Sequence, residues 1–147
     1  MKIIPAIDII DGKCVRLTQG DYDQKVEYAD SPIDVARCFE KAGLTHLHVV
    51  DLEGAKASQP INLPTLIDII TNTALKVDFG GGVKSNESIN RVLETGVSQV
   101  TAGSIAVKNP DLVKEWFENY YTGSTFDKEF DVKYKILFSS SKSGKPS

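Results

Sequence analysis

The sequence is poor in the features that cross-link a chain or carry it across a membrane. Its 147 residues contain two cysteines, Cys14 and Cys38, which are too few for a disulfide framework and too far apart for a CxxC motif. No apolar run approaches the roughly 20 residues that a membrane-spanning helix needs. We therefore expect a cytoplasmic protein with two reduced thiols and no membrane partner.

Charge of one sign is not in excess either. The chain has 17 lysines and arginines against 20 aspartates and glutamates, a formal net charge of −3, so we expect no general attraction for nucleic acid. Apolar residues make up 41% and charged residues 25%, which is the balance of an ordinary globular domain. An anionic ligand would have to be held by local geometry.

Short β-branched runs alternate with amphipathic helical stretches as far as residue 120. Repeated strand–helix units predict an α/β fold with a parallel sheet and right-handed crossovers. An open doubly wound sheet and a (β/α)8 barrel share this pattern, and four units are half a barrel. The predicted strands are residues 3–9, 44–52, 75–79 and 97–102, with a further short strand at 13–17, a polar excursion at 18–30, a loop at 53–61, and helices that begin near residues 31, 62, 85 and 109.

Residues 121–147 break this pattern. Residues 121–128 are polar where a fifth strand is due, and residues 139–147 are rich in Ser, Lys, Gly and Pro, a composition typical of a disordered tail. We expect two parts, a half barrel at 1–120 and a divergent, partly disordered tail at 121–147. A half barrel leaves its first and fourth strands with unpaired edges, so two copies could associate through them.

Two aspartates lie at the carboxyl ends of predicted strands in the same way, Asp8 in the first strand and Asp51 in the second main one. The carboxyl ends of parallel strands are where ligands bind and catalytic groups gather. A partly buried carboxylate there can act as a general base. The alternative for Asp8 is a structural acid that caps a loop amide or pairs with Lys13 or Arg16.

The strand at 44–52 has two faces, because successive side chains of a strand point to opposite sides. This parity places Asp51 with Leu47, opposite His46 and His48. The two histidines could share a metal, but no third ligand at suitable spacing appears, and we interpret them as ordinary strand residues.

Two glycine turns follow strands. Residues 80–82 are three consecutive glycines before a helix that Ser85 can cap, and Gly103-Ser104 repeats the arrangement one unit later. Glycine lets the backbone approach an anion, and a helix N-terminus supplies N–H groups and a positive dipole end. One such turn could be only a tight bend, whereas two at successive strand ends indicate phosphate binding. The pattern matches neither the P-loop nor the dinucleotide fingerprint.

Together these motifs resemble one family. The resemblance lies in residues 4–17, 19–21, 48–55, 79–85 and 103–106, which include Pro-Ala-Ile-Asp at 5–8 and Val-Asp-Leu at 50–52. They are similar to the phosphoribosylformimino-5-aminoimidazole carboxamide ribotide isomerases of histidine biosynthesis, as far as about Tyr120. The sister cyclase subunit of imidazole glycerol phosphate synthase shares the barrel and the phosphate loops, but its opening tends towards Pro-Cys-Leu-Asp.

The resemblance implies a (β/α)8 barrel that catalyses an Amadori rearrangement of an aminoaldose to an aminoketose, without metal or organic cofactor. It implies that Asp8 is the proton acceptor. It makes Asp131 the candidate for the second catalytic carboxylate, although residues 122–129 lack the apolar strand that should hold such an acid. One phosphate of the bisphosphorylated ribotide substrate is expected at Gly81, Gly82, Gly103 and Ser104.

Three hypotheses remain open at this point. The first is a truncated isomerase, which could be inactive alone because half of the active-site rim is missing. The second is a half-barrel module that binds phosphate without catalysis or assembles with another copy. The third is a cyclase on the same fold.

Overall fold

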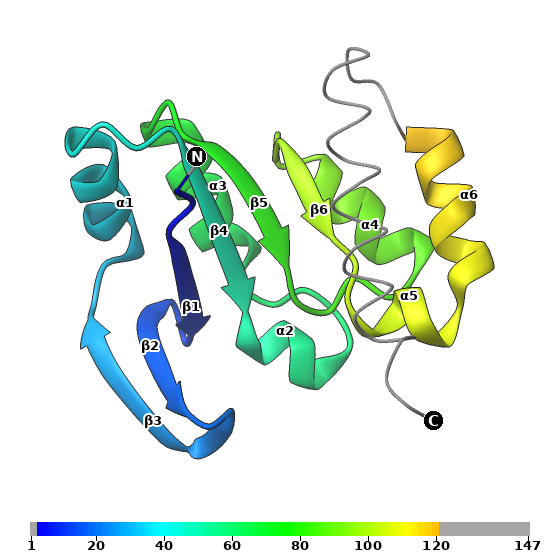
Figure 1. Ribbon diagram of the computed structural model, residues 1–147, viewed down its shortest axis with the longest axis horizontal. Coiled ribbons are helices and arrows are strands. Elements are labelled where there is room, and N and C mark those ends of the chain that lie inside the picture. The colour runs from blue at the N-terminus through cyan, green and yellow to red at the C-terminus, as the bar shows by residue number, and fades with distance from the viewer. Residues whose placement is uncertain (1–2, 121–147) are drawn as a thin grey trace. The chain divides into compact units, whose positions relative to one another are not determined.

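The computed structural model describes residues 3–120, which form an α/β fold around one six-stranded sheet of order β3-β2-β1-β4-β5-β6 (Figure 1). The chain divides into two compact units, Met1–Val100 and Thr101–Ser147. The predictions for residues 121–147, Asp131 among them, lie outside the described residues. The elements are β1 (Ala6–Ile10), β2 (Lys13–Thr18), β3 (Asp21–Ala29), α1 (Pro32–Lys41), β4 (His46–Asp51), α2 (Leu52–Ala57), α3 (Leu63–Asn72), β5 (Lys76–Gly80), α4 (Asn86–Leu93), β6 (Gln99–Thr101), α5 (Ser104–Lys108) and α6 (Pro110–Tyr120).

The predicted βα units are confirmed. Strand β4 pairs in parallel with β1 on one side and with β5 on the other. Helix α1 precedes β4, α2 and α3 lie between β4 and β5, and α4 lies between β5 and β6. Within the described residues the sheet stays open, with β3 at one end and β6 at the other. This is the α/β class expected for part of a (β/α)8 barrel.

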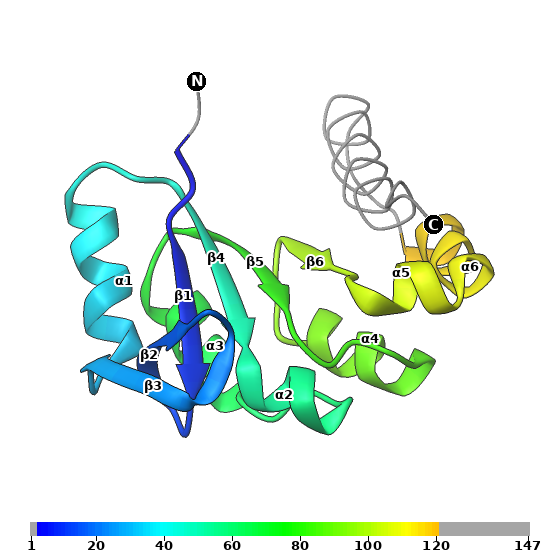
Figure 2. The same cartoon turned by 60° about the horizontal axis from the view of Figure 1, so that its bottom comes forward.

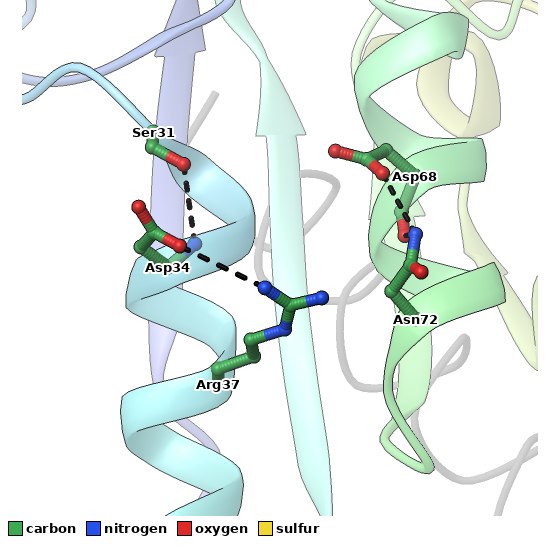
Figure 3. Close-up of polar contacts among 5 residues, drawn as sticks. All are labelled: Ser31, Asp34, Arg37, Asp68 and Asn72. Atoms are coloured by element: carbon green, nitrogen blue, oxygen red, sulfur yellow. Dashed lines mark hydrogen bonds and ion pairs between the residues drawn. The ribbon is translucent and has the colours of Figure 1, made fainter.

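Local sequence signals set the ends of the helices. The Ser31 hydroxyl accepts a hydrogen bond of 3.3 Å from the Asp34 amide at the start of α1, and Pro32 occupies the first turn. Asp34 also lies 4.0 Å from the Arg37 guanidinium on the exposed side of α1 (Figure 3). Such caps satisfy amides that have no partner within the helix. No helix among residues 3–120 combines the length and the apolar character that a membrane span requires.

The strands of the first unit present a buried face and a half-buried face. Side chains alternate between the two along β1 and β4. The buried face forms the core and carries Ile7, Ile9, Leu47, Val49, Val77 and Phe79, each no more than 1% exposed. The other face carries Asp8, His48, Val50 and Asp78, which are all partly accessible. The candidate functional side chains therefore lie on the half-buried face.

Two segments before β5 differ from the sequence prediction, and the short helix α5 was not predicted either. The polar excursion expected at 18–30 contains β3, which pairs antiparallel with β2 from Cys14 to Thr18. Most residues of β3 are exposed, so it lacks the apolar run by which the other strands were recognised. The loop expected at 53–61 begins with the short helix α2, whose first turn is capped by the Asp51 side chain.

The first strand is also not the free edge that we expected. The hairpin of β2 and β3 extends from the tip of β1 (Figure 2), and β2 pairs with β1 from Asp8 to Ile10. The hairpin folds back because residues 11 and 12 both adopt positive φ and reverse the chain. Strand β3 therefore forms the end of the sheet on this side, and the pairing of first and fourth strands between two copies was wrongly predicted in this form.

Candidate active site

Asp8 is the third residue of β1 and lies beside Val15 of β2 and Val50 of β4. Its side chain is half-buried. Burial raises the pKa of its carboxyl above the ordinary value, and the charge of His48 partly opposes this rise. Lys13, one of the partners considered for a purely structural role, instead lies 3.6 Å from Glu27. A half-buried carboxylate with a raised pKa is suited to accepting a proton.

His48 and Asp78 form a pair on the same face of the sheet. The His48 Nδ1 lies 3.0 Å from Asp78 Oδ2, and the two side chains are 24% and 15% exposed. Both side chains lie on the same face of the sheet as Asp8. His48 is the register partner of Ala6 on β1 and of Asp78 on β5, and Ala6 shares its face of β1 with Asp8. Among residues 3–120 no group of three or more potential ligands could hold a metal ion, and His46 lies with its Nδ1 2.7 Å from the Thr45 hydroxyl.

Asp51, the second acid that the sequence marked, is fully buried on the opposite face. Its carboxylate accepts hydrogen bonds from the amides of Gly54 (2.8 Å), Ile61 (2.7 Å) and Asn62 (2.7 Å), and from the Asn62 side chain (2.8 Å). These donors occupy both oxygens and tie the end of β4 to the start of α3. Asp51 is therefore a structural acid, and its hydrogen bonds leave it no evident role in proton transfer.

The glycines after β5 lie against protein backbone. Gly81 and Gly82 have φ of +113° and +85°, and a Cβ on Gly81 would lie 2.2 Å from the Asp51 carbonyl oxygen. A Cβ on Gly82 would lie 2.6 Å from the carbonyl carbon of Gln59 and from the Gly54 carbonyl oxygen. Glycine is thus required at both positions by the turn itself, whatever else the turn binds.

The start of helix α4 is closed by a capping box. The Ser88 hydroxyl accepts from the amides of Lys84 (3.0 Å) and Ser85 (2.8 Å), and the Ser85 hydroxyl accepts from the Ser88 amide (3.1 Å). Side chains of the helix therefore already use amides that the sequence argument had assigned to an anion.

Gly103 and Ser104 belong to the second unit, where Gly103 precedes the short helix α5. Within that described helix no side chain caps the N-terminus, and the Ala106 amide donates to the Gly103 carbonyl at 3.0 Å. The same unit contains α6, in which Trp116 is buried.

Two residues that shape the site were not singled out from the sequence. The alternation of side chains along the strand could have placed Asp78 on one face with Lys76. Only the register of β5 with β4 shows that Asp78 lies beside His48. Asn62 was read as a helix opener. In the structure it does precede α3 as the N-cap residue, and its side chain also donates to both Asp51 and Glu53.

Comparison with known proteins places these features in a family context. The family model described as "Histidine biosynthesis protein" matches residues 2–135 of the chain. A curated protein of Flavobacterium psychrophilum, named 1-(5-phosphoribosyl)-5-((5-phosphoribosylamino)methylideneamino) imidazole-4-carboxamide isomerase, is 56% identical over 120 residues, which are 82% of this chain and 50% of that protein.

Two further relatives carry the same name. The protein of Bacteroides thetaiotaomicron is 55% identical over 120 residues, again 82% of this chain and 50% of its own length. That of Bacteroides fragilis strain YCH46 is 52% identical over 123 residues, or 84% of this chain and 52% of its own length. The chain thus spans about half the length of the curated relatives it matches.

Proposed function

Because this chain belongs to the family of histidine biosynthesis proteins, we propose that it supplies the first half of a sugar-phosphate isomerase. The proposed reaction converts an aminoaldose ribotide to an aminoketose by an Amadori rearrangement, an intramolecular oxidation–reduction in L-histidine biosynthesis. The observations that carry this proposal are the 56% identity to an imidazole-4-carboxamide isomerase over 120 residues and the family match at residues 2–135, which include Asp8 and the glycine turn.

In the proposed mechanism Asp8 is the base. Ring opening of the aminoaldose gives a protonated Schiff base between C1 and the amine nitrogen. Asp8 then takes the proton from C2, the C2–H electron pair forms a C1–C2 double bond, and the C–N π pair moves to nitrogen. Tautomerisation of the resulting enol gives the ketose. The half-buried position of Asp8 and the raised pKa of its carboxyl support this role.

Asp131 remains our proposal for the acid that opens the ring. It lies outside the described residues, so its proposed role rests on the family resemblance and its place in the sequence alone.

The test of this mechanism is the Asp8→Asn variant in a full-length protein that begins with this chain. Asparagine keeps the shape of the side chain and cannot accept the proton, so turnover of the aminoaldose should fall by roughly 10²–10⁴. Asp68→Asn, an exposed change on α3 that keeps an acceptor for Asn72 (Figure 3), is the matched control and should leave turnover unchanged. Near-normal turnover by Asp8→Asn would exclude Asp8 as the base.

We also propose that the backbone amides of Gly81 and Gly82 bind phosphate of a bisphosphorylated substrate, and that those of Gly103 and Ser104 in the second unit do so as well. The side-chain-free turn after β5 and the uncapped start of α5 support this proposal. Bulky substitutions at Gly81 or Gly82 cannot test it, because they would collide with backbone. The direct measurement is the change in the amide NMR signals of these four residues on titration with inorganic phosphate, with chloride at equal ionic strength as control. Shifts that chloride reproduces would reject the site.

The two alternatives predict different measurements. A phosphate-binding module would show saturable phosphate binding and no isomerisation in any assembled form. A cyclase would close the imidazole ring of the ketose product in the presence of ammonia. The names of the relatives favour the isomerase.

Two further proposals concern the setting of the protein. We place it in the cytoplasm, since Cys14 and Cys38 are both free thiols, as expected in a reducing compartment. We also propose that the chain self-associates through its open sheet, with the exposed Val26 and Tyr28 of β3 in the contact.

A further inference from the structure

The His48–Asp78 pair lies one row away from Asp8 on the half-buried face of the sheet. Ala6, His48 and Asp78 are register partners across β1, β4 and β5, and Asp8 is paired with Val50 in the next row. His48 is therefore diagonal to Asp8, two positions back along the neighbouring strand. Diagonal neighbours of this kind lie within reach of long side chains and of each other's charge.

The contact between the pair fixes which ring nitrogen carries a proton. An ionised carboxylate can only accept a hydrogen bond, so the Nδ1 that lies 3.0 Å from Asp78 Oδ2 must be the donor. The Nε2 of His48 is then the nitrogen that gains or loses the second proton. When both nitrogens are protonated, the ring carries a positive charge beside Asp8.

We propose that Asp78 is a positioning residue that acts on Asp8 through His48, by holding the imidazole at its Nδ1 so that the ring lies beside the Asp8 carboxylate. This inference rests on the proposed role of Asp8 as the base. A base must be ionised before it reacts, and burial works against ionisation. The His48 charge works in the opposite direction, since it lowers the pKa that burial of Asp8 has raised.

The other titratable groups near Asp8 do not take over the effect of the His48–Asp78 pair on its ionisation. Strand β6 adds no titratable group at residues 99–101. Burial raises the pKa of the Tyr22 and Tyr28 phenols, so both stay neutral while a carboxyl titrates. The remaining ionisable groups of β2, β3, β4 and β5 are the same in every variant compared below. They are Lys13, Cys14, Arg16, Asp21, Asp23, Lys25, Glu27, His46, Asp51 and Lys76.

The decisive measurement is the titration midpoint of the Asp8 carboxyl, followed by carbon-13 NMR of the chain and assigned from the signal that Asp8→Asn removes. Asp78→Asn has two opposed effects on this midpoint. Loss of the Asp78 charge alone should lower the midpoint, because a nearby like charge disfavours ionisation of Asp8. Loss of the contact that holds the His48 ring beside Asp8 should raise the midpoint. We expect Asp78→Asn to raise the midpoint, and His48→Gln to raise it at least as far.

The double variant separates an action through His48 from any other. With His48→Gln already present, adding Asp78→Asn should raise the midpoint no further. Asp68→Asn, an exposed acid on α3, is the control and should leave it unchanged. A midpoint that falls or stays constant in Asp78→Asn, or that rises equally with and without His48, overturns the proposal.

A second measurement needs no substitution at Asp78. Nitrogen-15 shifts of the His48 ring distinguish the two neutral forms, and the proposal requires the proton on Nδ1. A neutral ring protonated at Nε2 alone would overturn it. Because neither measurement involves turnover, this proposal can fail while the isomerase assignment stands, and the reverse is equally possible.

Discussion

Asp8 and Asp51 carry the same chemical group, a carboxylate, in two different environments. Asp51 is fully buried and accepts hydrogen bonds from the amides of Gly54, Ile61 and Asn62, which tie the end of β4 to the start of α3. Asp8 is half-buried on the accessible face, where burial raises the pKa of its carboxyl. Asp51 is therefore expected to stabilise the folded state, and Asp8 is expected to weaken it at neutral pH.

Replacing each aspartate by asparagine tests this contrast. Asp51→Asn should lower the free energy of unfolding by at least about 2 kcal/mol, because an amide NH2 would face two of the donors that now share one oxygen. Asp8→Asn should instead raise the free energy of unfolding at neutral pH, since a carboxyl whose pKa rises on folding costs stability when ionised. Urea denaturation of both variants against the parent measures the two effects.

The pH dependence of the Asp8→Asn effect follows from the direction of its shift. The folded state holds the Asp8 proton more tightly, so its contribution to stability falls as pH rises from the unfolded pKa to the higher folded pKa. The gain from Asp8→Asn should be full above this window and should vanish below the unfolded pKa of aspartate, about 4. A variant less stable than the parent at neutral pH would contradict the raised pKa.

The sequence could not separate these two residues. Each lies near the carboxyl end of a predicted apolar strand, and the pattern of neighbouring residues is similar. What makes Asp51 structural is a set of donors up to 11 positions further along the chain, held in place by the turn into α3. The pattern of residues around Asp51 contains no information on that turn. The position of Asp8 on one face of β1, by contrast, follows from the alternation of side chains along a strand.

At the scale of elements, strands and helices were recognised where they carry a core face. Helix α1 and its Ser31 cap follow the sequence signals, and β4 and β5 coincide with apolar runs. Strand β3 was missed because it is mostly exposed, although Tyr22, Val26 and Tyr28 do alternate with charged residues. Helix α2 was missed because a glycine in six residues reads as a loop.

The close approach of the turn after β5 to the end of β4 gives the prediction at this scale. Gly81→Ala should destabilise the protein well beyond the roughly 1–2 kcal/mol that positive φ costs an alanine, because its Cβ would lie 2.2 Å from the Asp51 carbonyl oxygen. Gly43→Ala is the matched control, with φ of +91° and nothing within 4 Å of the added Cβ. Equal losses of unfolding free energy in the two variants would show that the β5 turn has room for a side chain.

At the scale of residues 3–120 taken together, the open sheet is the feature with the largest physical consequence. The sequence predicted the βα units and the presence of free edges, but it placed one edge at β1. The structure places β3 there, since β2 pairs with β1. Long-range register of this kind depends on how a turn closes, and the reversal at Asp11 and Gly12 could not be inferred from apolar periodicity.

Self-association is the prediction that belongs to this scale. The face of β3 exposes Val26 (59%) and Tyr28 (49%), and an edge strand has backbone groups that can pair with another chain. Its charged neighbours weaken such pairing, so we expect a reversible complex whose apparent mass rises with concentration. Val26→Lys should shift the protein towards the monomer, because it sets a charge in the contact. Ile67→Lys, which changes an exposed residue of α3 (45%), should associate as the parent does. Light scattering at micromolar concentration decides the matter, since a monodisperse monomer in the parent would rule out association through β3.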